Sequence, residues 1–122
     1  MARVVAHLPD LLFGSKVHAM LAGAGRDVTV AATVRDAVAR LDGAELFVAD
    51  LCEDAAARIA AATGHLDDVK ALAFYLHTDV QTRTRALGAG FDVVVPRSRM
   101  AREGAALVDG LLGADVPATW TH

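Results

Sequence analysis

Short apolar runs alternate with segments of helical periodicity along the chain, and this alternation constrains the fold more than any other feature. The apolar runs are mostly continuous rather than alternating with polar residues. Such runs are typical of strands that are covered on both faces, as in a parallel sheet. We therefore predict strands at 4–8, 27–31, 45–49, 70–76 and 91–95.

Between these runs, apolar residues recur three or four positions apart, which predicts helices that bury one face against a sheet. Glycine follows most of these segments, and glycine readily adopts the left-handed conformation that ends a helix. Thr33, Thr78 and Ser98 are the expected N-caps of three of the helices. The apolar positions that mark these helices span residues 13–21, 34–41, 55–62, 80–87 and 100–111.

Five strand–helix units within residues 1–113 predict one α/β domain with a parallel sheet, right-handed crossovers and helices on both faces. Residues 114–122 are expected to form an irregular tail, in which Trp120 serves either as a packing anchor or as a contact residue. We see neither a linker nor an internal repeat.

Composition excludes several classes of protein. The chain is 54% hydrophobic and 22% charged, which is too apolar for intrinsic disorder. A formal net charge of −3 argues against a protein that coats nucleic acid. One cysteine cannot form an internal disulfide or a cysteine-rich metal site. No apolar run approaches the roughly 20 residues of a membrane helix, and the first residues do not resemble a signal peptide. We expect a cytoplasmic domain without membrane or direct nucleic-acid partners.

Polar residues follow four of the predicted strands. In an open α/β sheet, reactive groups gather beyond the carboxyl ends of the strands. The candidates are His7, Pro9 and Asp10; Asp50, Cys52, Glu53 and Asp54; His77, Thr78 and Asp79; and Arg97 and Arg99.

Asp50 directly follows a continuous apolar run, so its carboxylate is expected at the edge of the sheet. One interpretation is structural: Asp50 or Glu53 caps the next helix and complements its dipole. The other is a functional carboxylate. The residue pattern alone favours the structural interpretation.

Two segments resemble the receiver domain of bacterial two-component response regulators, the CheY-like family. Ala86-Leu87-Gly88-Ala89-Gly90-Phe91-Asp92 is similar to the family's junction between the fourth helix and the fifth strand. Leu46-Phe47-Val48-Ala49-Asp50-Leu51 is similar to its third strand, which ends in the phosphoacceptor aspartate. The resemblance covers Arg3 to about Leu112 and implies a doubly wound, flavodoxin-like sheet of order 2-1-3-4-5.

By this resemblance Asp50 occupies the phosphoacceptor position, and Cys52 the position whose backbone carbonyl ligates magnesium. The family's acidic pair corresponds to His7 and Leu8, which are not carboxylates. Magnesium usually takes one or two carboxylates together with water and phosphate oxygens. Asp50 therefore lacks its main co-ligands, unless Asp10 substitutes through a loop that bends back.

The switch positions also depart from the family pattern. Arg97 occupies the position of the invariant lysine, and its planar fork favours a static pair with Asp50. Tyr75 occupies the Thr/Ser switch position, where it would crowd a phosphoryl group or donate a hydrogen bond to Asp50. Val94 replaces the usual aromatic switch residue.

We therefore predict a degenerate receiver, a pseudo-receiver that takes part in phosphorelay signal transduction. It is expected to work by protein contact rather than as an enzyme, with aspartyl phosphorylation weakened or absent and no cofactor. Its partner would be a histidine kinase or an output protein. The surface of the helix at 80–87, the strand at 91–95 and the helix at 100–111 would bind this partner or a second copy of the chain.

Other interpretations remain open. One alternative is that Asp50 is a working phosphoacceptor for a histidine kinase, with Asp10 completing the magnesium site; another is that the domain binds a small molecule. His7 and His77 with Asp50 or Asp10 would suit zinc if they converge. Cys52 is expected to be passive, because neighbouring acids oppose thiolate formation. A basic cluster forms either solvated helix faces or a docking surface for an acidic partner; its members are Arg83, Arg85, Arg97, Arg99 and Arg102.

Overall fold

A computed structural model describes residues 3–113. Its strands are β1 (Arg3–His7), β2 (Asp27–Ala31), β3 (Leu46–Asp50), β4 (Lys70–Tyr75) and β5 (Val93–Pro96). Its helices are α1 (Leu11–Gly23), α2 (Val34–Ala39), α3 (Ala55–Ala62), α4 (Val80–Gly88) and α5 (Arg97–Leu112). The expected tail at 114–122, including Trp120, lies outside the described residues.

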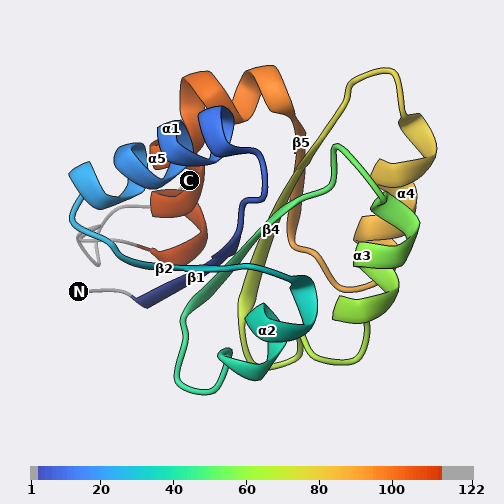
Figure 1. Cartoon of the computed structure of the whole chain (residues 1–122), viewed down its shortest axis with the longest axis horizontal. Coiled ribbons are helices and arrows are strands. Elements are labelled where there is room, and N and C mark those ends of the chain that lie inside the picture. The colour runs from blue at the N-terminus through green and yellow to red at the C-terminus, as the bar shows by residue number, and fades with distance from the viewer. Residues whose placement is uncertain (1–2, 114–122) are drawn as a thin grey trace.

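The five strands form one parallel sheet of order β2-β1-β3-β4-β5, as predicted (Figure 1). β1 and β3 pair side by side with His7 opposite Ala49, and β3 pairs with β4 with Asp50 opposite Phe74. This register brings the carboxyl ends of the three central strands to one edge.

Helices cover both faces of the sheet (Figure 1). α1 and α5 pack on one face, where Phe13, Val17 and Met100 are buried. α2, α3 and α4 pack on the other face, around Phe47 and Phe91. β1, β3 and β4 lie between the two layers, which explains why their sequences are continuously apolar. β2, at the edge of the sheet, is partly exposed instead.

Several element ends differ by one to three residues from those expected. Thr33 caps α2 as predicted and accepts a hydrogen bond from the Asp36 N–H at 3.0 Å. The expectations for Thr78 and Ser98 are wrong. Asp79, directly before the first helical residue, caps α4, and α5 begins straight after Pro96, so that Ser98 lies inside the helix. Proline fixes its own φ and prepares the chain for a helix at the next residue.

The segment at 86–92 has a structural explanation. Gly90 adopts a φ of 111°, and the Phe91 N–H returns to the Ala86 carbonyl at 3.2 Å. Asp92 then exchanges two hydrogen bonds with Ala71: its N–H donates to the Ala71 carbonyl, and its Oδ2 accepts from the Ala71 N–H, both at 2.8 Å. The segment therefore ends α4 and sets the register in which β5 joins β4.

Gly14 fixes the position of α1 against the end of β1. A Cβ at this position would lie 2.8 Å from the Leu8 carbonyl oxygen and 3.0 Å from the Leu8 Cβ. Because only glycine permits this approach, the start of α1 lies directly beside the carboxyl edge of the sheet.

Candidate functional site

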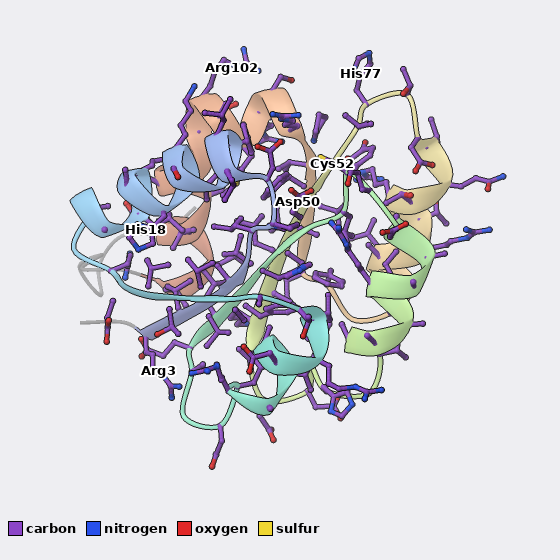
Figure 2. All side chains as sticks on the ribbon, viewed as in Figure 1. Arg3, His18, Asp50, Cys52, His77 and Arg102 are labelled. Carbon is purple, nitrogen blue, oxygen red and sulfur yellow. The ribbon has the colours of Figure 1, made fainter. Side chains whose placement is uncertain are left out.

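The carboxyl edge of the sheet brings together most of the residues singled out in the sequence. Asp50 ends β3, and Cys52 follows it, at the top of the central strands (Figure 2). His7 ends β1, Tyr75 ends β4, and Arg97 begins α5 directly after β5. The parallel topology therefore places these side chains at one edge, as the sequence predicts.

Asp50 is buried, with 4% of its surface exposed. Its Oδ1 accepts a hydrogen bond from the Cys52 N–H at 2.8 Å, which closes a tight turn after β3. The interpretation of Asp50 or Glu53 as the cap of α3 is wrong. Asp54 occupies the N-cap of α3 without a side-chain hydrogen bond, and the first turn of the helix carries no acid. The Asp50 side chain therefore stabilises the turn after β3, and α3 begins without a side-chain cap.

Arg58 of α3 reaches back to Asp50, a contact that the sequence did not predict. Its Nη1 donates a hydrogen bond to the Asp50 backbone carbonyl at 2.8 Å. Arg58 is the one charged residue in α3, whose sequence is AAARIAAA. This isolated charge, one turn into the helix that follows β3, could have identified Arg58 from the sequence. We call His7, Asp50, Cys52 and Arg58 the Asp50 cluster.

His7 is buried to the same extent, with 4% exposed, and its Nδ1 has no hydrogen-bond partner within residues 3–113. Burial lowers the pKa of His7 below its ordinary value, and the positive charge of Arg58 lowers it further. A hydrogen bond to the Ala32 backbone and the charge of Asp50 act in the opposite direction. His7 therefore favours the neutral form in the folded protein.

Cys52 has an environment that opposes nucleophilic chemistry. Burial raises its pKa to about 12, helped by the charge of Asp50 and a hydrogen bond to its side chain, while Arg97 and Arg58 oppose the rise. A reactive cysteine needs the opposite shift, because the thiolate is the nucleophile. The expectation of a passive Cys52 agrees with this environment.

Arg97 and Asp10 form an ion pair outside the Asp50 cluster. The Arg97 Nη2 lies 3.6 Å from the Asp10 Oδ2, and the guanidinium stacks 4.3 Å from the centre of the Phe13 ring. The expected pair between Arg97 and Asp50 is therefore not formed. Asp10 is already committed, because its Oδ1 caps α1 by accepting from the Leu12 and Phe13 N–H groups.

The remaining family positions are filled by packed side chains. Leu8 is buried in the core layer beneath α1 and α5. Tyr75, 7% exposed, and Val94, 6% exposed, are buried in the layer beneath α2, α3 and α4. The Tyr75 hydroxyl makes no hydrogen bond to another described residue, so the expected donation to Asp50 is absent.

The side chains at this edge do not fit a magnesium ion. Within residues 3–113, no three His, Cys, Asp or Glu side chains gather in a way that could hold a metal. Arg58 contacts Asp50 through its backbone carbonyl, and Asp10 is engaged with Arg97. The proposed zinc ligands do not converge either, since His77 lies on the exposed loop after β4, away from Asp50 (Figure 2).

A groove of about 300 Å³ opens at the same edge, on the side of β5. We call it the Arg97 groove. It is lined by Phe13, Leu76, His77, Pro96, Arg97, Ser98 and Ala101. Separately, no helix in the described part of the chain is long and apolar enough to cross a membrane.

No protein-family model and no curated protein sequence matches this chain. Solved structures do match. A response regulator from Thermotoga maritima superposes with a TM-score of 0.76 at 15% identity, covering 93% of this chain and 99% of the other. A LuxR family DNA-binding response regulator from Silicibacter pomeroyi gives a TM-score of 0.74 at 21% identity, covering 98% and 100%.

A third similar structure is that of an atypical orphan response regulator whose regulatory mechanism is described as independent of phosphorylation. It gives a TM-score of 0.74 at 15% identity and covers 92% of this chain and 96% of the other. At these identities the similarity establishes the receiver fold, while the chemistry must be argued from the side chains at the edge.

Proposed function

We propose that this chain is an atypical response-regulator receiver domain that signals by protein contact, without phosphorylation of Asp50. The observation that carries the proposal is that His7 and Leu8, both buried, stand at the positions of the acidic pair, so neither position supplies a second carboxylate beside Asp50. The receiver fold supports the signalling role, and the composition of the Asp50 cluster supports the loss of phosphorylation.

Phosphoryl transfer depends on positioning and on neutralising the charge of the phosphoryl group, chiefly by a metal ion and a cationic side chain. In this chain, the positions of the acidic pair hold a buried imidazole and a buried leucine. The arginine at the lysine position is paired with Asp10 and stacked on Phe13. Arg97 is therefore engaged with Asp10 and Phe13 rather than with Asp50.

The buried state of the edge also disfavours the small-molecule alternative at Asp50. His7 and Asp50 are 4% exposed and Leu8 is 6% exposed, so the junction of β1 and β3 is filled by the protein itself. The same filling disfavours the working phosphoacceptor, because a phosphoryl group would need that space. We propose a signalling module whose output passes through its surface rather than an enzyme.

The direct test is incubation of the protein with magnesium and acetyl phosphate, followed by measurement of its intact mass by mass spectrometry. In parallel, beryllofluoride is added and backbone NMR shifts are recorded. We expect no stoichiometric phosphoryl adduct and no shifts that spread from Asp50 to α4. The Asp50→Asn variant is the control for adducts at other residues. Stoichiometric modification that Asp50→Asn removes would overturn the proposal and restore the working phosphoacceptor.

A gain-of-function variant sharpens this test. His7→Asp with Leu8→Asp restores the acidic pair, and Arg97→Lys restores the movable point charge. If the missing groups are the reason for inactivity, the folded triple variant should bind magnesium more tightly than the parent and accept a phosphoryl group more readily. Circular dichroism and thermal unfolding establish that the variant is folded.

A further inference from the structure

The buried His7 ring carries one nitrogen without a partner. Its Nδ1 is enclosed and makes no hydrogen bond to another described residue, so the bond to the Ala32 backbone comes from Nε2. That bond favours the protonated ring, which identifies the Ala32 carbonyl as its acceptor. The neutral ring therefore holds its proton on Nε2, and Nδ1 is left as an acceptor. Buried polar atoms without a partner are rare in folded proteins, and this one requires an explanation beyond packing.

His7 lies on the sheet face that is covered by the helix carrying Arg58. Side chains alternate along a strand, so His7 shares a face with Val5, and it pairs in register with Ala49. Val5 and Ala49 both belong to the core layer beneath α2, α3 and α4. Arg58 reaches this face from α3, and its positive charge lowers the pKa of His7. A second positive charge, on His7, would therefore be repelled by Arg58.

The other titratable groups around His7 do not outweigh Arg58. The charge of Asp50 on β3 favours a protonated His7, but its effect is smaller than that of Arg58. Cys52 has a pKa raised to about 12, so its thiol stays neutral near neutral pH. Asp27 lies at the opposite end of β2. The remaining charged residues of the packed elements are exposed or paired at the surface: Arg35, Asp36 and Arg40 on α2, and Glu53 and Asp54 before α3.

Arg58 also links α3 to the end of β3 across the turn at 51–54. Its Nη1 donates to the Asp50 carbonyl at 2.8 Å. Asp54, within the turn, has a φ of 49°, a conformation that residues other than glycine rarely adopt. α3 begins without a side-chain cap. The junction between β3 and α3 therefore depends on the Arg58 contact. Because Arg58 is only partly buried, its guanidinium can turn to solvent.

We propose that His7 and Arg58 form a pH switch, in which a proton bound at His7 Nδ1 displaces Arg58 from the Asp50 carbonyl and loosens the turn at 51–54. The proton comes from solvent, and Nε2 keeps its own, so the new N–H is the only covalent bond that forms. Imidazolium and guanidinium repel each other in this weakly solvated site, and the partly exposed Arg58 is the one that moves. A proton thus replaces a phosphoryl group as the input at this edge, and in that respect the inference rests on the proposed function.

The test is an NMR titration of the full chain from about pH 7.5 down to the onset of unfolding, which circular dichroism defines. Long-range ¹H–¹⁵N spectra report the protonation of both His7 ring nitrogens, and amide spectra report the turn. We expect Nδ1 to be unprotonated at the start of the titration. The amides of Cys52, Glu53 and Asp54 should then shift with the same midpoint as His7. Below that midpoint the Cys52 amide should exchange about tenfold faster relative to its intrinsic rate.

Two variants separate the switch from general effects of acid. In His7→Gln the amides of the turn should lose this pH dependence. In Arg58→Met they should resemble those of the acidified parent already at about pH 7.5 and should not follow His7, because the contact is missing at every pH. His65→Gln and Arg35→Met are the matched controls, since both residues are exposed and lie outside the Asp50 cluster. Both should titrate like the parent.

Four results would each overturn the inference. His7 stays neutral until the protein unfolds; Nδ1 rather than Nε2 carries the proton of the neutral ring; the amides of the turn do not follow the His7 midpoint; or their shifts persist in His7→Gln. The acetyl phosphate experiment has a different readout, the mass of an adduct on Asp50. Such an adduct overturns the proposed function and leaves the His7 titration interpretable, so the two failures are distinguishable.

Discussion

The Asp50 cluster and the Arg97 groove lie at the same edge of one sheet, yet their physical character is opposite. The cluster, over β1 and β3, buries its ionisable residues: Asp50 and His7 are each 4% exposed. The groove, beside β5, keeps its charged residue half exposed, with Arg97 at 41%. Parallel topology alone places polar groups at this edge, but it does not decide whether they face the interior or the solvent.

The two regions differ in whether their polar groups are bonded within the protein or reach the solvent. In the cluster, the polar groups of Asp50 are hydrogen-bonded within the protein: the Cys52 N–H donates to the Asp50 carboxylate, and Arg58 donates to the Asp50 carbonyl. In the groove, a cation and an apolar floor stay accessible. The cluster is therefore closed to solvent, whereas the groove is accessible to it. Four predictions test this division, beginning with the largest effect.

Phe13→Ala should be the most damaging single change, because Phe13 belongs to the core as well as to the groove. Its ring is 8% exposed, meets Phe74 edge-on at 5.2 Å and supports Arg97. We expect a loss of about 3–5 kcal/mol in the free energy of unfolding, measured by urea denaturation. The neighbouring Leu12→Ala, at an 87% exposed position, should change it by less than about 0.5 kcal/mol. Equal losses would contradict the assignment of Phe13 to the core.

Arg58→Met should have the next largest effect, because it keeps the apolar stem and removes the donor to the Asp50 carbonyl. Leaving that part-buried acceptor without its partner is expected to cost about 1–3 kcal/mol. The pKa of His7 should also rise, since a nearby positive charge is removed. Denaturation and an NMR titration of His7 measure the two effects. Arg35→Met on α2 is the control, and a pKa of His7 unchanged by Arg58→Met would refute the electrostatic contact.

The pH dependence of stability should report His7. Its folded pKa lies below the ordinary value of 6.5, so the unfolded chain binds a proton more readily. The contribution of neutral His7 is complete above pH 6.5 and is lost as the pH falls from there through the folded pKa. Unfolding of the parent and of His7→Gln is compared between about pH 7.5 and 5. A steeper decline in the parent is expected, and parallel curves would argue against a buried neutral His7.

Substitutions of Asp10 should have the smallest effects, and they distinguish its role as the cap of α1 from its role as the partner of Arg97. Asp10→Ala removes both the cap of α1 and the partner of Arg97, at a cost of about 1 kcal/mol. Asp10→Asn keeps a capping oxygen and loses only the charge, for at most a few tenths of a kcal/mol, because the ion pair is largely exposed. Thermal unfolding compares them. If the two variants were equally destabilised, the ion pair rather than the cap would be the main contribution.

Much of the fold was predictable from local features. Continuous apolar runs and helical spacing identified every strand and helix, because each pattern depends on residues close in sequence. The segment at 86–92 was recognised as a junction, and its hydrogen bonds to Ala86 and Ala71 explain its composition. The position of Asp50 at the edge followed from the apolar run before it.

The pairing of charged side chains was less predictable. Arg97 was expected beside Asp50, but it lies against Asp10 and Phe13, and Arg58 was not singled out at all. These contacts join residues that are distant in sequence. Which partner an arginine reaches depends on where its helix starts and on the direction of its side chain, and neither is encoded locally.

Local sequence is enough to specify the parallel α/β architecture and the residue types at the carboxyl edge, since periodicity and the polarity of strand ends are local properties. The burial of Asp50 and His7 and the accessibility of Arg97 depend instead on how the elements pack. Gly14 lets α1 approach Leu8 closely, which brings Asp10 and Phe13 to Arg97, while α3 carries Arg58 to Asp50. Burial and charge pairing emerge from such contacts between elements.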